Sequence, residues 1–329
     1  MPDDPGRELL RAEHLTRHFK IGGAMARRTL HAVDDVNFSI GQREIVALAG
    51  ESGSGKSTIA RLLARIYKPT AGEISYEGKP LSQLRSRRDR LRYSGQVPMV
   101  FQDPFSSLNP VFRVSHGVLR SLKLHRPELS ESQRRDEAAR VFEVVGLDAE
   151  MLQRFTYELS GGQRQRVGFA QALVTRPKLI LADEPVSMLD VSIRIGLLNL
   201  MAKLRDEENV SILYITHDIA SARYVADRLI VMYAGQIAES GPIEDVLASP
   251  KHPYTQLLLS AVPTRGRRWA WPRRPTGASR RRSSTRAPAA GSAGAARWPS
   301  TPAPASPRCS PSWRRGTRWP ATSPRPARK

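Results

Sequence analysis

The most constraining feature of this chain is a glycine-rich segment between an apolar run and a helical pattern. Residues 50–57 read GESGSGKS and fit the pattern G-x-x-x-x-G-K-S/T at every fixed position. The preceding run, Glu44–Ala49, is short, apolar and partly β-branched, as in a buried strand. After the segment, apolar residues recur at helical spacing, at Ile59, Leu62, Leu63 and Ile66. The pattern ends at Pro69, and it predicts a strand, a tight loop and a helix in direct succession.

A glycine-rich loop that opens a helix binds phosphate, because free backbone N–H groups and the positive end of the helix dipole both face the anion. We therefore expect the loop to hold the phosphates of ATP. Lys56 is expected to reach the β- and γ-phosphates, and the Ser57 hydroxyl to ligate Mg²⁺. The expected nucleotide-binding residues here are Gly50, Glu51, Ser52, Gly53, Ser54, Gly55, Lys56, Ser57 and Thr58.

Two further apolar runs, Leu179–Ala182 and Ile212–Ile215, predict buried strands. Apolar strands alternating with helices indicate an α/β fold with a parallel sheet that is covered on both faces. Asp183 directly follows the first run, so it should emerge at the carboxyl edge of the sheet, where such sheets bind ligands. We expect Asp183 to hold Mg²⁺ through water, and Glu184 to act as general base for the attacking water.

A second phosphate-binding helix terminus is predicted at Ser160, Gly161, Gly162 and Gln163. A Ser N-cap followed by two glycines leaves backbone donors open to an anion. The chain thus has two such termini but one phosphate loop. The economical arrangement is a head-to-tail dimer, in which each ATP lies between the loop of one chain and Ser160 of the other.

Between these motifs, residues 111–157 read as a helical insert. Ser130 and Gln133 form a plausible capping box, and the apolar stripe that follows ends at Gly146. Beyond it, Leu229–Tyr233 and Gln236–Glu239 predict a strand pair around Gly235, and a short helix is expected from Tyr254 to Leu259. The arginine-rich stretch from Arg85 to Arg92 reads as a solvated face.

From about residue 10 to residue 264, the order of these motifs resembles the ATPase subunit of an ABC transporter. The resemblance implies a P-loop NTPase core, with a mostly parallel sheet, an N-terminal antiparallel β subdomain and the inserted helices. It implies that Gln102 lines Mg²⁺ and the attacking water, that Asp190 contacts the facing monomer, and that His217 holds the γ-phosphate and orients the base. Phe19 resembles the aromatic residue that stacks on adenine; core packing of Phe19, or stacking by His18 in its place, are the alternatives. Gly168 and Gln171 stand where the family commonly has Ala and Arg.

Two stretches, 100–110 and 252–263, resemble the peptide and nickel import ATPases. The resemblance implies an ATP-hydrolysing subunit that energises import of di- or oligopeptides, with peptide transport the first expectation and nickel chelates or oligosaccharides open. It implies two transmembrane permease subunits, a second ATPase subunit that is identical or paralogous, and indirectly an extracytoplasmic solute-binding protein. No apolar run approaches the roughly 20 residues of a membrane span, residues 1–264 contain no Cys, and the start shows no signal-peptide pattern. We therefore expect a peripheral protein at the cytoplasmic face of the membrane.

The net charge of +21 comes mainly from the segment after Thr264. That segment holds 17 basic residues and no acid, so residues 1–264 carry 35 basic against 31 acidic groups. We therefore do not expect nucleic acid as a partner of the folded part. Residues 265–329 also lack Leu, Ile, Val and Phe, so this tail cannot offset an ordering cost of roughly 1–2 kcal/mol per residue, and it is expected to be disordered.

The composition of the tail fits two different origins. The tail consists mainly of Arg, Ala, Pro and Ser, a composition typical of GC-rich DNA translated in a shifted reading frame. This composition predicts a frameshift after Thr264. A native basic tail that binds acidic lipid headgroups or nucleic acid is the alternative.

Two rival functions share the nucleotide motifs. A translation or DNA-repair ATPase usually carries two cassettes or a long coiled-coil insertion, and this sequence has neither. A non-catalytic nucleotide-binding module is disfavoured because Glu184 and His217 are both present.

Overall fold

The computed structural model describes residues 8–22, 28–103 and 108–260, and the structural statements below concern these residues. The expectations for the tail after Thr264 lie outside them, as do residues 104–107 of the stretch 100–110 and residues 261–263 of the stretch 252–263. Within the described part, no helix combines the length and apolar composition that a membrane crossing requires.

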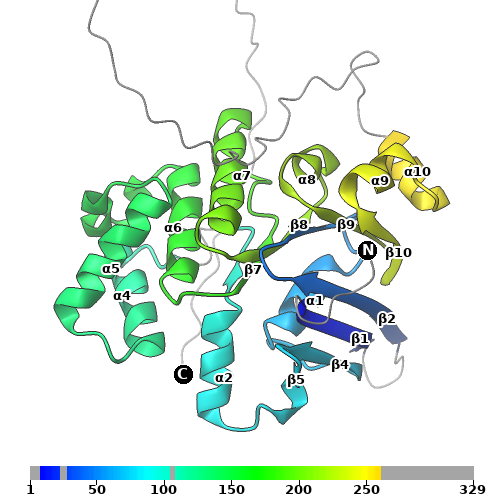
Figure 1. The fold of residues 1–329 in the computed structure, drawn as a ribbon, viewed down its shortest axis with the longest axis horizontal. Helices are drawn as coiled ribbons and strands as arrows, with labels where there is room; N and C mark the ends of the chain where they lie inside the picture. Colours follow the sequence, from blue (N-terminus) through cyan, green and yellow to red (C-terminus); the bar gives the residue numbers. More distant parts are fainter. Residues whose placement is uncertain (1–7, 23–27, 104–107, 261–329) are drawn as a thin grey trace, which may run out of the picture. The chain divides into compact units, whose positions relative to one another are not determined.

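A six-stranded sheet forms the centre of the fold, in the order β10-β9-β3-β8-β7-β6 (Figure 1). All neighbouring pairs are parallel except β9 and β10, which form an antiparallel hairpin. The five expected strands are confirmed as β3 (Ile45–Ala49), β7 (Leu179–Asp183), β8 (Ser211–Thr216), β9 (Arg228–Tyr233) and β10 (Gln236–Pro242), and the short edge strand β6 (Met99–Val100) was not predicted. The β9–β10 turn has positive φ at both Ala234 (47°) and Gly235 (85°), as expected of a tight hairpin.

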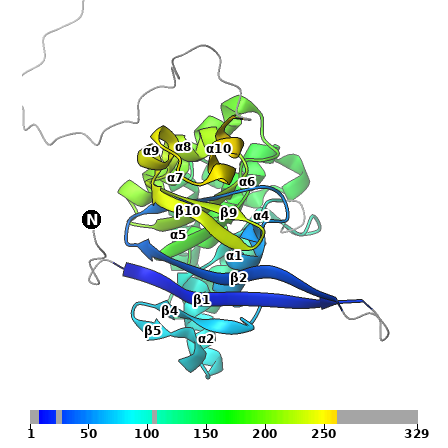
Figure 2. The ribbon, with the colours of Figure 1, turned by 90° about the vertical axis from the view of Figure 1, so that its right-hand side faces the viewer.

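A second, antiparallel sheet has the strand order β2-β1-β4-β5, which confirms the expected N-terminal β subdomain. Its strands are β1 (Glu8–Ile21), β2 (Arg28–Gly41), β4 (Ala71–Tyr76) and β5 (Lys79–Pro80). β1 and β2 run side by side as a long hairpin (Figure 2). Register shifts along this pair bend it, as β-bulges do.

The helices divide into those that cover the central sheet and those of the insert. The first group is α1 (Lys56–Leu63), α6 (Gly161–Leu173), α7 (Val191–Asp206), α8 (Ile219–Val225), α9 (Ile243–Ala248) and α10 (Pro253–Ser260), while α2 (Arg87–Gln96) packs beside α4 of the insert. The insert holds α4 (Val114–His125) and α5 (Glu131–Val144), followed by short 3-10 turns at Ala149–Gln153 and Thr156–Glu158. The capping box of Ser130 and Gln133 is confirmed at the start of α5. The arginines on and beside α2 are exposed, as expected.

The two faces of the central sheet pack into two different hydrophobic cores. Ile45, Ala47 and Ala49 of β3 join the core that contains α6 and α7. Val46 and Leu48 join the core that contains α1 and the antiparallel sheet. Because side chains alternate between the faces of a strand, α1 and α6 lie on opposite faces of the sheet.

Candidate functional site: a phosphate loop and a carboxylate centre

The phosphate loop connects β3 to α1 through glycines that no other residue could replace without strain. Gly50 has φ +150° and Gly55 has φ +106°. A Cβ added at Gly50 would lie 2.3 Å from the carbonyl oxygen of Met232, and one at Gly55 would lie 2.2 Å from that of Ala32. The loop is therefore pressed between the end of β9 and the β1–β2 hairpin, which fixes its path.

The side chain of Lys56 is buried and folds back over the loop. Its Nζ donates to the carbonyl oxygens of Gly50 (2.8 Å) and Glu51 (2.6 Å). Burial lowers the pKa of Lys56, and the nearby carboxylates of Glu184 and Asp183 oppose that shift. A cation is thus held at the mouth of the loop, within reach of a phosphate bound to its backbone.

Ser57 and Asp183 meet where α1 begins and β7 ends. The Ser57 Oγ donates to Asp183 Oδ1 at 2.9 Å. Asp183 is 5% exposed, and burial raises its pKa, while the Ser57 hydrogen bond opposes the shift. A hydroxyl and a carboxylate are the hard oxygen donors that Mg²⁺ prefers. The donor set therefore fits the predicted magnesium site.

The three predicted catalytic residues converge on one oxygen atom. Gln102 Nε2 donates to Glu184 Oε2 at 3.1 Å, and His217 Nδ1 lies 3.3 Å from the same oxygen. They come from the ends of β6, β7 and β8, which are neighbours in the sheet. Glu184 itself has φ +46°, and its N–H donates to the carbonyl of Ile215. This carboxylate centre is the arrangement that a general base with two orienting partners requires.

One link to the carboxylate centre was not predicted from the sequence. Gln165, a buried residue of α6, donates from Nε2 to the carbonyl oxygen of Phe101 at 3.3 Å. The residue next to Gln102 is thereby attached to the helix that begins at Ser160. The only sequence signal was the position of Gln165 in that helix.

Ser160 is exposed at the N-terminus of α6, and it caps the helix as predicted. Its Oγ accepts from the Gln163 N–H, and Gln163 Oε1 accepts from the Ser160 N–H. Gly162 allows close packing, because a Cβ there would lie 2.4 Å from Ile193 of α7. Asp190, also exposed, is the N-cap residue of the same α7.

The Ser160 turn and the phosphate loop do not form one site within the chain. They lie on helices that pack into different cores, on opposite faces of the central sheet. Among the residues that the structure describes, no hydrogen bond joins residues 160–163 to residues 50–58. The N-terminus of α6, predicted to bind an anion, is therefore not used by the phosphate loop of its own chain.

The structure separates the two candidates for adenine stacking. Phe19 is half-buried against Tyr67, with ring centroids 5.4 Å apart, and the Arg17 guanidinium lies 4.6 Å from its ring. His18 lies instead beside His31 and Asp34. Stacking by Phe19 remains a prediction.

Two features near the site have no counterpart in the sequence expectations. The hydroxyl of Tyr254, in α10, accepts a hydrogen bond from the Glu51 N–H of the phosphate loop at 3.1 Å.

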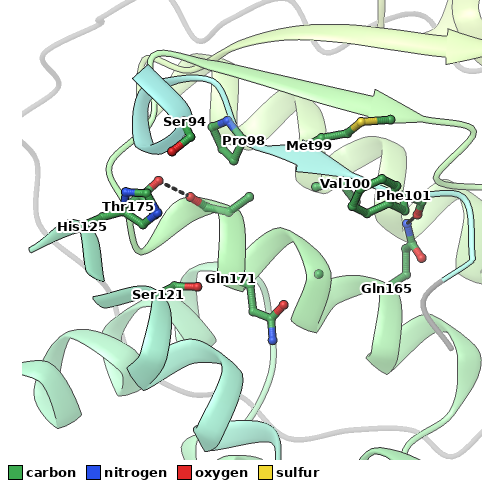
Figure 3. Close-up of a pocket in the computed structure, with 12 residues that line it drawn as sticks. Ser94, Pro98, Met99, Val100, Phe101, Ser121, His125, Gln165, Gln171 and Thr175 are labelled. Carbon is green, nitrogen blue, oxygen red and sulfur yellow. Dashed lines mark hydrogen bonds between the residues drawn. The ribbon is translucent and has the colours of Figure 1, made fainter. Parts of the chain in front are cut away.

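Separately, a cavity of about 230 Å³ lies between β6 and the helices α2, α4 and α6 (Figure 3). Gln171 lines this cavity and packs closely on Gly117 of α4, where a Cβ would lie 2.2 Å from Nε2.

Comparison with known proteins places these motifs in one family. Residues 33–187 match the family model described as ABC transporter, and residues 238–292 match the model described as oligopeptide/dipeptide transporter, C-terminal region. The chain is 41% identical over 256 residues to the oligopeptide transport ATP-binding protein OppF of Bacillus subtilis, covering 78% of this chain and 83% of the relative. It is also 41% identical over 256 residues to a putative peptide import ATP-binding protein of Brucella ovis, covering 78% of this chain and 79% of the relative.

Solved structures of ATP-binding cassettes share the fold. The dimeric, post-hydrolysis cassette MJ0796 bound to ADP and Pi matches with a TM-score of 0.64 and 28% identity, over 71% of this chain and 99% of that one. The protein cbiO1 of Clostridium perfringens, part of an ABC transporter complex, matches with a TM-score of 0.63 and 28% identity, over 74% of this chain and 92% of that one. With the phosphate loop, the Ser160 turn and the carboxylate centre in place, the chain belongs to the ATP-binding subunits of ABC transporters and is an ATPase.

Proposed function

We propose that this protein is the ATP-hydrolysing subunit that energises import of di- or oligopeptides through an ABC permease. The convergence of Gln102 and His217 on Glu184 Oε2 is the observation that carries the enzymatic part. The match of residues 238–292 to the oligopeptide/dipeptide C-terminal region, and the peptide transport names of the relatives, support the cargo class.

In the proposed mechanism, the phosphate loop and Lys56 bind the triphosphate of ATP. Glu184 accepts a proton from the water that attacks the γ-phosphorus, while Gln102 and His217 orient the Glu184 carboxylate. Ser57 and Asp183 would hold Mg²⁺, which when bound neutralises developing charge on the phosphate oxygens. Burial keeps Asp183 in a fixed position beside the loop.

The active unit is proposed to be a head-to-tail dimer. Ser160 is exposed, and its helix packs on the opposite face of the sheet from α1, so its helix N-terminus would contact the γ-phosphate on a second ATPase subunit. Asp190 caps the adjacent α7 and would lie in the same interface. The second subunit is identical or a paralogue.

The protein is proposed to act at the cytoplasmic face of the membrane, bound to two permease subunits. Gln165 connects the segment before Gln102 to α6, which packs against α4 and α5 of the insert. When the dimer closes around ATP, these contacts would transmit the movement to the permease. A solute-binding protein would deliver the peptide to the permease on the extracytoplasmic side of the membrane. A role on ribosomes or nucleic acid is not supported by the relatives.

The test is reconstitution in lipid vesicles with two peptide permease subunits and a peptide-binding protein from the same organism. Peptide-loaded binding protein should stimulate ATP hydrolysis and peptide uptake together, and nickel chelates should not. Stimulation by a nickel chelate alone, or by ribosomes in the absence of permease, would contradict the proposed cargo or the transport role.

A further inference from the structure

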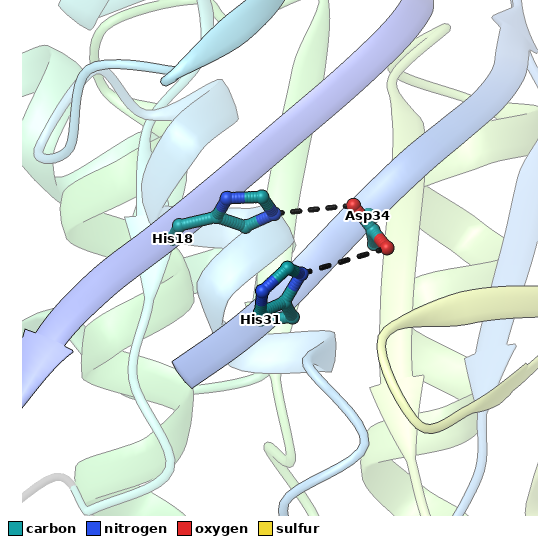
Figure 4. A group of neighbouring side chains, drawn as sticks. All are labelled: His18, His31 and Asp34. Atoms are coloured by element: carbon teal, nitrogen blue, oxygen red, sulfur yellow. Dashed lines mark hydrogen bonds and ion pairs between the residues drawn. The ribbon is translucent and has the colours of Figure 1, made fainter. Parts of the chain in front are cut away.

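Two imidazoles and a carboxylate, side chains of types that can ligate a metal, meet on the β1–β2 hairpin, apart from the Glu184 centre (Figure 4). His18 Nε2 lies 3.1 Å from Asp34 Oδ1, and His31 Nδ1 lies 3.7 Å from Asp34 Oδ2. One ligand atom from each residue lies within 4.8 Å of the other two. We propose that His18, His31 and Asp34 bind one divalent transition-metal ion of the Zn²⁺ class. This site goes beyond the transport function and does not depend on it.

The ligand chemistry separates this ion from the Mg²⁺ of the ATP site. Two imidazole nitrogens and one carboxylate suit Zn²⁺ and its neighbours in the first transition row, whereas Mg²⁺ prefers oxygen donors alone. Zn–N bonds of about 2.0–2.1 Å in a tetrahedron place ligand atoms about 3.3 Å apart. The separations of 3.1 Å and 3.7 Å run to different oxygens of Asp34, so binding requires the side chains to rotate until one ion is reached by all three.

The backbone holds the three ligands in place. His18 and His31 are direct partners across the β1–β2 pair, and Asp34 lies three residues after His31, next to the register shift between Arg17 and His18. The two imidazole rings already lie 3.9 Å apart, with a 39° tilt. The side chains are 26%, 54% and 37% exposed for His18, His31 and Asp34. An ion can therefore enter from solvent and keep water as a fourth ligand.

The same hairpin segment touches the phosphate loop. The Ala32 carbonyl oxygen is the atom that a Cβ at Gly55 would strike. The Asp34 N–H donates to the Gly235 carbonyl oxygen, and the Gly235 N–H donates to that of Ser54. A metal that fixes residues 31–34 therefore acts on the loop, and by linkage ATP must act on the metal.

The direct test is titration of the nucleotide-free, full-length protein with Zn²⁺ against a chromogenic competing chelator. All proteins carry Cys309→Ser, because a thiolate would also bind Zn²⁺. His31→Ala should lower the affinity at least about 10-fold, and excess Mg²⁺ should not compete. Asp34→Asn, which keeps the backbone N–H that contacts Gly235, provides a second variant with the same expected loss.

The matched control is His14→Ala. His14 lies on β1, as His18 does, and its Nδ1 lies 2.7 Å from Asp35 Oδ1. This second histidine–aspartate pair contains one imidazole only. Wild-type affinity in His31→Ala, or an equal loss in His14→Ala, would overturn the site. For the coupling, ATP affinity at a buffered free Zn²⁺ concentration should change in the wild type and not in His31→Ala. An equal response in both proteins would overturn the link to the loop.

Discussion

Glu184 sits in a backbone conformation that few non-glycine residues adopt. Glu184 is the first residue after β7 and has a φ of +46°. Its N–H donates to the carbonyl oxygen of Ile215 in β8. This left-handed geometry costs roughly 1–2 kcal/mol, and it turns the carboxylate toward Gln102 and His217. Glu184 is proposed as the base from its place after an apolar strand, and this role stays a prediction. Its backbone strain could not be predicted from the sequence, because φ depends on the neighbouring strand.

Replacing Glu184 with Gln keeps the size and the contacts of the side chain but removes the proton acceptor. Turnover should fall by about 10²–10⁴-fold, while ATP still binds, so that an ATP-bound dimer accumulates in size-exclusion chromatography. Glu77→Gln, which alters an exposed ion pair with Lys178 far along the chain, is the control and should turn over normally. An undiminished rate in Glu184→Gln would rule this residue out as the base.

Asp183 should make the stability of the fold depend on pH. Burial raises its pKa in the folded protein. A carboxyl group with a raised folded-state pKa contributes its stability below the pKa of the unfolded chain, and loses it as pH rises through the raised value. Asp183→Asn, which still accepts the Ser57 hydrogen bond, should therefore raise the melting temperature at neutral pH by a few degrees. The gain should vanish in acid.

Thermal melting of both proteins from pH 3 to pH 8, without Mg²⁺, measures this difference. The same variant should lose ATPase activity, because the side chain proposed to hold Mg²⁺ is altered. A neutral-pH melting temperature equal to or below that of the wild type would contradict the account of Asp183.

At the scale of elements, the sequence predicts strands and helices whose determining residues are neighbours in the chain. The runs before Gly50 and Asp183 are strands because their apolar residues stand together, and the capping residues Ser130 and Ser160 begin helices as expected. Contacts between distant elements could not be predicted in this way. Tyr254 and Glu51 are 203 residues apart, and nothing local in either segment indicates the other.

Tyr254 should steady the phosphate loop through that contact. Tyr254→Phe keeps the ring that contacts Tyr233 but removes the acceptor for the Glu51 N–H. A hydrogen bond worth about 0.5–1.5 kcal/mol corresponds to a loss of about 2- to 10-fold in ATP affinity. Calorimetric titration with non-hydrolysed ATP analogue measures it. Tyr233→Phe is the matched control, and an equal effect of the two changes would contradict a role for the Tyr254 hydroxyl.

At the scale of the whole molecule, the two helices that begin at the phosphate loop and at Ser160 cover opposite faces of the central sheet. α1 packs into the core with the antiparallel sheet, and α6 packs into the core with α7. The sequence already predicted two termini for one loop. It could not show that they lie on opposite faces of one sheet, because that follows from which alternate side chains each helix covers. A site completed by a second chain is the reading that uses both termini.

Mixing two inactive variants tests this composite site most directly. Lys56→Ala removes the loop cation, and Ser160→Asp keeps an N-cap acceptor for α6 but sets a negative charge against the phosphate. Each protein alone should lack ATPase activity. A one-to-one mixture should regain roughly a quarter of wild-type activity, because half of the dimers are mixed and each mixed dimer has one intact site. Wild-type turnover by Ser160→Asp alone would contradict the account.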